Sequence, residues 1–225
     1  RTGELNVGNP ENITVLSKPR AINVLVVDMI EGFTRKGIYA SPVVEALIEP
    51  QKRFLEQLPN LSYVVFACEA HDPRDDEMKV CPCHCLKASE EAAICPELRD
   101  AVRARNIQHD VIQKATWSAF YNNPEMEKAA NRHYIAGGRD NTKWVVIGCV
   151  TDICVLANVL ELLYRGKDVI LLRDLITTYQ ITPEFAAKVL GDPEKAHETN
   201  GATSIGAREC VLGVKNSTRS QYGIG

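Results

Sequence analysis

The stretch KWVVIGCVTDICVLANVLELLY, residues 143–164, changes from one structural pattern to another within a single turn. Its first part, Val145-Val146-Ile147, is apolar and β-branched, which predicts a buried strand. From Asp152 onward the stretch is long and apolar enough for a helix over residues 152–164. A strand that passes directly into a helix is the repeating unit of a parallel α/β sheet.

The same alternation continues on both sides of this stretch. Apolar runs predict strands over residues 21–27, 62–67, 110–113, 143–147 and 168–172. Amphipathic stretches predict helices over residues 42–57, 124–133, 152–164 and 183–190. Pro42, Pro124 and Pro183 stand near first-turn positions, where proline is tolerated. We therefore expect an α/β fold with a parallel sheet.

Length and composition restrict the class of protein further. With 225 residues and 45% hydrophobic content, the chain fits one substantial domain, which we place at residues 21–225 after an N-terminal extension, residues 1–20. The net charge of -3 and scattered lysines and arginines argue against nucleic-acid binding. We find no apolar stretch of membrane-spanning length and no signal-peptide core. We expect a soluble, cytoplasmic protein with reduced cysteines, although a leader removed before Arg1 stays open.

Polar residues gather where the predicted strands end. Asp28, Lys114 and Cys154 follow three strands, and His71 follows a fourth and opens the segment 71–94, which is too long for an ordinary strand-to-helix connection. Parallel strands end at the same edge of a sheet, which is where open α/β sheets bind ligands. The sequence therefore predicts a carboxylate, an imidazole, an ammonium and a thiol at one edge.

Each of these residues also has an ordinary interpretation. A free cysteine is most often a core residue, which is how we interpret Cys149, whereas Asp28 could cap a turn and Lys114 could be a surface charge. Cys154 falls in the first turn of a helix, where the helix dipole is expected to lower its pKa from about 8.5. Together the three residues form a base, a charge stabiliser and a nucleophile.

Four stretches carry a resemblance to a known family: VVDMIEGF (26–33), EAH (69–71) with PCHCL (82–86), Lys114 with WSAF (117–120), and GCVTDICV (148–155). They resemble the motifs of the isochorismatase-like cysteine hydrolases, and among these the nicotinamidases, in the same order. The resemblance covers roughly residues 22–206.

The resemblance implies a Rossmann-like three-layer α/β/α fold in a single domain, with a catalytic triad of Asp28, Lys114 and Cys154. It also implies a cis peptide between Val150 and Thr151, and an oxyanion hole formed by the N–H groups of Thr151 and Cys154. Family members often form homo-oligomers, and we expect the same here.

Nicotinamidases also hold a divalent metal, zinc, manganese or iron, beside the triad. The resemblance places its ligands at Glu69, where the family usually has Asp, and at His71 and His84, with Glu77 as a further ligand. Two imidazoles and carboxylate oxygens suit these metals. Two alternatives stay open: no metal at all, or zinc in the cluster Cys81-Pro82-Cys83-His84-Cys85. No organic cofactor is expected.

The resemblance places two aromatic residues, Phe33 and Trp117, around a substrate ring. Phe120 is expected close to the same wall, with core packing as its alternative. The resemblance implies hydrolysis of nicotinamide to nicotinate and ammonia, in the salvage of nicotinamide cofactors. The alternatives are hydrolysis of another small amide, carbamoyl or maleamate-like, and a catalytically silent member of the fold that only binds.

Overall fold

The structure is a computed structural model that describes residues 21–79, 81–132, 143–178 and 202–205. Six parallel strands form one sheet in the order β3-β2-β1-β4-β5-β6. The strands are β1 (Asn23–Val27), β2 (Tyr63–Glu69), β3 (Gln108–Lys114), β4 (Lys143–Cys149), β5 (Asp168–Thr177) and β6 (Ala202–Ile205). All five predicted strands are present. The sixth was missed because its four residues carry too short an apolar pattern to be recognised.

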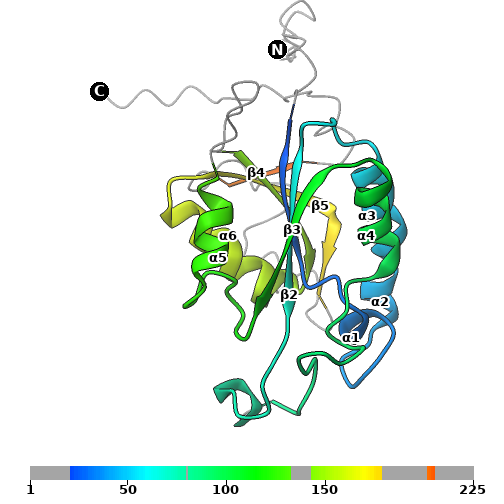
Figure 1. Ribbon diagram of the computed structural model, residues 1–225, viewed down its shortest axis with the longest axis vertical. Coiled ribbons are helices and arrows are strands. Elements are labelled where there is room, and N and C mark those ends of the chain that lie inside the picture. Colours follow the sequence, from blue (N-terminus) through cyan, green and yellow to red (C-terminus); the bar gives the residue numbers. More distant parts are fainter. Residues whose placement is uncertain (1–20, 80, 133–142, 179–201, 206–225) are drawn as a thin grey trace, which may run out of the picture.

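Helices cover both faces of the sheet, which confirms the three-layer α/β/α fold (Figure 1). One layer holds α1 (Glu31–Thr34), α2 (Pro42–Glu45), α3 (Ile48–Glu56) and α4 (Pro96–Ala104); the other holds α5 (Pro124–Ala130) and α6 (Leu156–Tyr164). Strand β1 serves both layers, because alternate side chains point to opposite faces. Val24 and Val26 pack in the core beneath α3 and α4, whereas Leu25 and Val27 pack beneath α5 and α6.

The helix predicted over residues 42–57 is two helices, α2 and α3, separated at Ala46 and Leu47. Pro50 explains the break, because proline lacks an N–H and its ring clashes with the carbonyl four residues earlier, here that of Ala46. Proline is tolerated only in a first turn, so α3 begins at Ile48. The short helices α1 and α4 were not predicted, and the predicted helix 183–190 and the extension 1–20 lie outside the described residues.

The order of the strands reverses between β1 and β4, which are neighbours in the sheet. In this type of sheet the ligand crevice lies at the carboxyl ends of the strands, beside that reversal. Residue 148 faces Val27 across the two strands and has a φ of 125°. A Cβ atom there would lie 2.0 Å from the Val27 carbonyl oxygen, so only glycine allows the strands to approach this closely.

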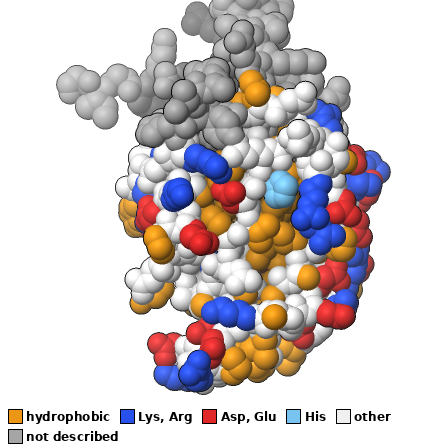
Figure 2. Space-filling view, in the orientation of Figure 1, with side chains coloured by type: hydrophobic (Ala, Val, Ile, Leu, Met, Phe, Trp, Pro, Cys, Tyr) orange, Lys and Arg blue, Asp and Glu red, His pale blue; other side chains and the backbone are white. Residues whose placement is uncertain are grey.

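Three features of the described residues concern the surface and the cysteines. Basic and acidic side chains are interspersed over the face shown in Figure 2. Within the described residues, no helix is long and apolar enough to cross a membrane. The seven cysteines in the described part of the chain are free thiols.

We predict that Gly148→Ala lowers the free energy of unfolding by about 1–3 kcal/mol from backbone strain, and by more once the contact with Val27 is counted. The matched control is Gly166→Ala, which also has a positive φ but meets nothing within 4 Å. Urea denaturation of both variants compares the two costs. Equal destabilisation would show that the contact with Val27 is unimportant.

Candidate active site

Four strands deliver buried polar groups to the carboxyl edge of the sheet. Asp28 follows β1, Glu69 ends β2, Lys114 ends β3, and Cys154 lies in a wide helical turn, η3 (Thr151–Val155), after β4. None of the four is more than 5% exposed. The structure thus brings together the acid, amine and thiol predicted from the sequence, and adds a second carboxylate.

The Lys114 ammonium is the centre of this group. Its Nζ lies 2.8 Å from Asp28 Oδ2, 3.1 Å from Glu69 Oε1 and 3.6 Å from Cys154 Sγ. It also donates to the carbonyl of Thr116 at 3.1 Å. The contact with Asp28 Oδ2 is an ion pair without good hydrogen-bond alignment, whereas Asp28 Oδ1 accepts the Glu69 N–H at 2.9 Å.

Burial and charge set the protonation states of the pair. Burial by itself would lower the pKa of Lys114, but the charges of Asp28, Cys154 and Glu69 raise it well above the usual value. Burial raises the pKa of Asp28 to about 6 against the opposing pull of Lys114. Lys114 is therefore a permanent cation, and Asp28 is a base that takes up a proton near neutral pH.

The pKa of Cys154 was expected to be lowered, and this expectation is wrong. Burial raises its pKa well above the usual value, and Asp28 and Glu69 add to the rise, while Lys114 opposes it. The positive end of a helix cannot compensate for complete removal of the sulfur from water beside two carboxylates. Cys154 is therefore a thiol rather than a thiolate at neutral pH.

The backbone around Cys154 differs from the prediction at one bond. The cis peptide joins Cys149 and Val150, not Val150 and Thr151. The carbonyl of Val150 accepts the N–H groups of Ile153 and Val155, both at 3.1 Å, so Val150 caps the helical turn that begins at Thr151. These two hydrogen bonds lie on either side of Cys154, and the oxyanion hole of Thr151 and Cys154 N–H groups stays a prediction.

A second group of ligands adjoins the first. Glu69, His71, Glu77 and His84 each offer one ligand atom, and these atoms all lie within 4.8 Å of one another. These are the four residues predicted as metal ligands. Figure 1 shows the long segment after β2, with the short helix η2 (Asp76–Lys79), projecting beyond the sheet edge. This segment supplies Glu77 and leads to His84.

The two histidines are oriented as metal-binding histidines usually are, with one ring nitrogen fixed and the other turned inward. His84 places Nδ1 2.7 Å from the carbonyl oxygen of Pro82, and His71 places Nδ1 3.3 Å from Asp75 Oδ2. Their Nε2 atoms face Glu69, at 3.2 Å for His84 and 3.6 Å for His71. The buried Nε2 of His71 has no hydrogen-bond partner among the described residues, so the residues present fit a divalent cation.

The alternative cluster of cysteines is not supported by the geometry. No metal-sized grouping among the residues that the structure describes includes Cys81, Cys83 or Cys85. Cys85 is fully buried in the core, whereas Cys83 is exposed. A thiol in the core and a thiol at the surface do not converge on one ion.

The three predicted aromatic residues lie in different environments. Phe33 is buried, with its ring 6.2 Å from that of His84, and Trp117 is exposed and donates its Nε1–H to Glu77 Oε1 at 3.3 Å. Phe120 packs in the core, with the Arg165 guanidinium 4.2 Å from its ring centre. Core packing, the alternative for Phe120, therefore describes it better than a place in the substrate wall.

Two residues near the site were not singled out from the sequence. Tyr39 places its ring edge-on to His84, with centres 4.7 Å apart. Asn158 is fully buried, accepts the Ala119 N–H at 2.9 Å, and donates to the carbonyl oxygens of Trp117 and Cys154. Asn158 thereby ties the loop after β3 to the turn that carries Cys154. A polar residue within the apolar run 155–163 is the signal that could have identified it.

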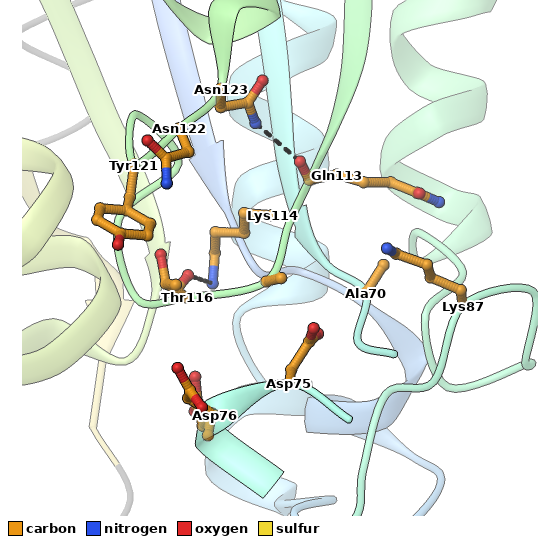
Figure 3. A pocket seen from close by; sticks show the side chains of 12 residues that line it. Ala70, Asp75, Asp76, Lys87, Gln113, Lys114, Thr116, Tyr121, Asn122 and Asn123 are labelled. Carbon is orange, nitrogen blue, oxygen red and sulfur yellow. Dashed lines mark hydrogen bonds between the residues drawn. The ribbon is translucent and has the colours of Figure 1, made fainter. Parts of the chain in front are cut away.

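A cavity of about 470 Å³ adjoins the site between the end of β3 and η2 (Figure 3). Lys114, Thr116, Asp75 and Lys87 are among its lining residues, but Asp28 and Cys154 do not line it. Figure 3 shows Lys114 turned toward the Thr116 carbonyl at the wall of this cavity. The cavity therefore borders Lys114 and Asp75, the hydrogen-bond partner of His71, but not the thiol of Cys154.

The fold has three layers, and a buried thiol, carboxylate and ammonium lie beside the place where the order of the strands reverses. This arrangement is typical of an α/β cysteine hydrolase. The family model of the isochorismatase domain matches residues 23–191. The chain belongs to the isochorismatase family. A search of curated proteins gave no match to this sequence.

Solved structures show the same fold at low sequence identity. N-carbamoylsarcosine amidase from Thermoplasma acidophilum is 23% identical, with 84% of this chain and 96% of that chain covered and a TM-score of 0.64. Nicotinamidase/pyrazinamidase from Bacillus subtilis is 19% identical over 82% and 98%, with a TM-score of 0.63. Pyrazinamidase of Pyrococcus horikoshii, solved in complex with zinc, is 19% identical over 84% and 99%, with a TM-score of 0.59.

We predict that Lys114→Met lowers the free energy of unfolding by about 3–5 kcal/mol at pH 7.5, because Asp28 and Glu69 are left buried without their cation. Burial raises the pKa of Asp28 from 3.8 to about 6, so ionisation of Asp28 lowers the stability of the fold as the pH rises through this range. At pH 5 Asp28 is mostly protonated, and the destabilisation by Lys114→Met should be smaller than at pH 7.5. Denaturant titrations at both pH values measure it. Lys87→Met, at an exposed lysine, is the control, and a loss no larger than that control would contradict the prediction.

Proposed function

We propose that this chain is an amide hydrolase that forms a thioester on Cys154, and that nicotinamide is its substrate. The observation that carries the proposal is the Lys114 ammonium, 2.8 Å from the Asp28 carboxylate and 3.6 Å from the Cys154 sulfur. A base, a fixed cation and a nucleophile within contact of one another are the minimum for covalent amide hydrolysis.

In the first half of the reaction, Asp28 takes the thiol proton as the sulfur attacks the amide carbonyl carbon. The pKa of Cys154 is raised, so the thiolate forms only during attack, with Lys114 stabilising the negative charge. The N–H groups of Thr151 and Cys154 are the proposed donors to the oxyanion. The C–N bond then breaks, ammonia leaves with the proton from Asp28, and a thioester remains on Cys154.

In the second half, Asp28 takes a proton from water, and the resulting hydroxide attacks the thioester carbonyl. The C–S bond breaks, the acid is released, and the sulfur of Cys154 regains the proton from Asp28. Lys114 keeps its charge in both halves, because its pKa lies well above the usual value. One acid therefore serves both proton transfers.

The ligand set of Glu69, His71, Glu77 and His84 would hold a divalent zinc, manganese or iron ion. When bound, such an ion supplies a Lewis acid that can orient a pyridine nitrogen. Phe33 and Tyr39 place aromatic rings against His84. A flat heteroaromatic amide fits these surroundings, which is the reason for proposing nicotinamide, and with it a role in cytoplasmic salvage of nicotinamide cofactors.

We predict that Cys154→Ala lowers kcat for ammonia release from nicotinamide by at least about 10³-fold, because no thioester can form. Cys83→Ser, at an exposed thiol, should keep its turnover. The same assay on carbamoyl and maleamate-like amides, with and without a chelator, identifies the substrate. Turnover of those amides alone would replace nicotinamide, and ligand binding without any turnover would leave only a binding role.

We also predict an acid limb in the pH profile of kcat/KM. The pKa of Asp28 is about 6, so below that pH the base is protonated and kcat/KM should fall about tenfold per unit. Ammonia release measured between pH 4.5 and 8 tests this. A profile that stays flat down to pH 4.5 would rule out Asp28 as the proton acceptor.

A further inference from the structure

Glu69 belongs to both ligand groups of the site. Its Oε1 lies 3.1 Å from Lys114 Nζ, and its Oε2 lies 3.2 Å from His84 Nε2. Among the described residues, the two metal-sized groupings at this edge, one with His71 and His84 and one with Asp28 and Cys154, share Glu69. A single carboxylate therefore contacts both the triad and the histidine pair.

The backbone of Glu69 is also attached to the triad. Its N–H donates to Asp28 Oδ1 at 2.9 Å, while its side chain pairs with Lys114. Glu69 and Lys114 stand opposite each other in the register of β2 and β3, so their side chains leave the sheet together. Glu69 thus fixes the base through its main chain and the cation through its side chain.

The length of the Glu69 side chain matters for this double contact. The carboxylate is 1% exposed and spans the gap between Lys114 and His84 with one oxygen on each side. Aspartate at this position would withdraw the carboxylate by one methylene. It could then keep one of the two contacts but not both.

We propose that Glu69 is a positioning residue for Asp28 and Lys114 as well as a member of the metal set, and that it couples cation binding to the reactivity of Cys154. The inference deepens the proposed function and rests on it for the role of Cys154. A cation at the histidine pair draws the charge of Glu69 away from Lys114, which leaves more of the ammonium charge for Asp28 and the sulfur. Lys114 pairs with the same carboxylate from the other side, so its charge in turn weakens cation binding.

The test compares Glu69→Gln with Glu77→Gln in protein stripped of metal. Glu77 belongs to the histidine set but bonds Trp117 rather than the triad, so it is the matched control. Two readouts are needed: zinc affinity by calorimetry, and the rate of Cys154 alkylation by iodoacetamide at pH 7.5, followed on the Cys154 peptide by mass spectrometry. Neither readout requires turnover.

We expect both variants to bind zinc at least about tenfold more weakly, since each loses a ligand. Only Glu69→Gln should change the alkylation of metal-free protein, raising its rate about three- to tenfold because Lys114 no longer shares its charge with a second carboxylate. Zinc should accelerate alkylation more in the parent protein than in either variant. Glu69→Asp should restore either the zinc affinity or the alkylation rate of the parent protein, but not both.

Equal alkylation rates in Glu69→Gln, Glu77→Gln and the parent protein would overturn the inference and leave Glu69 as a ligand only. Circular dichroism establishes that each variant is folded. If Glu69→Gln does not fold, the comparison of Glu69→Asp with Glu77→Gln tests the inference instead. Failure of the proposed function gives a different result. The parent protein then hydrolyses no amide, yet the alkylation rates of Glu69→Gln and Glu77→Gln still differ.

Discussion

One buried ammonium organises this site. Lys114 is 3% exposed and contacts the carboxylates of Asp28 and Glu69 and the sulfur of Cys154. Removing such a charge from water is expensive unless opposite charges surround it, and a buried carboxylate has the same requirement. The three charged groups therefore stabilise one another in place, and loss of Lys114 leaves both carboxylates without their cation.

The sheet makes this meeting of charges possible. Asp28, Glu69 and Lys114 lie at the ends of β1, β2 and β3, and the turn after β4 brings Cys154 beside them. Gly148 allows β4 to approach β1 closely enough for that turn to reach Asp28. Strands on both sides hold the groups in position, which is what the proposed reaction requires of a thiol that loses its proton only during attack.

The glutamate at position 69 joins the two groups of the site. Its side chain connects Lys114 with His84, so the triad and the ligand set form one continuous network of charge. In such a network the occupancy of one part alters the electrostatics of the other. The aromatic rings of Phe33 and Tyr39 border the same histidine, next to this network.

The sequence by itself determined the elements and the chemistry at their ends. Apolar β-branched runs identified β1 to β5, and their ends placed Asp28, Lys114 and Cys154 at one edge of the sheet, because these signals are local and periodic. The ligand set came from the resemblance to the nicotinamidases, which rests on short motifs in the sequence. Tertiary structure decided the rest. The raised pKa of Cys154, the bond that is cis, the burial of Phe120, the anchoring by Asn158 and the double contact of Glu69 depend on neighbours distant in sequence. Burial and charge are sums over such neighbours, and no local pattern records them.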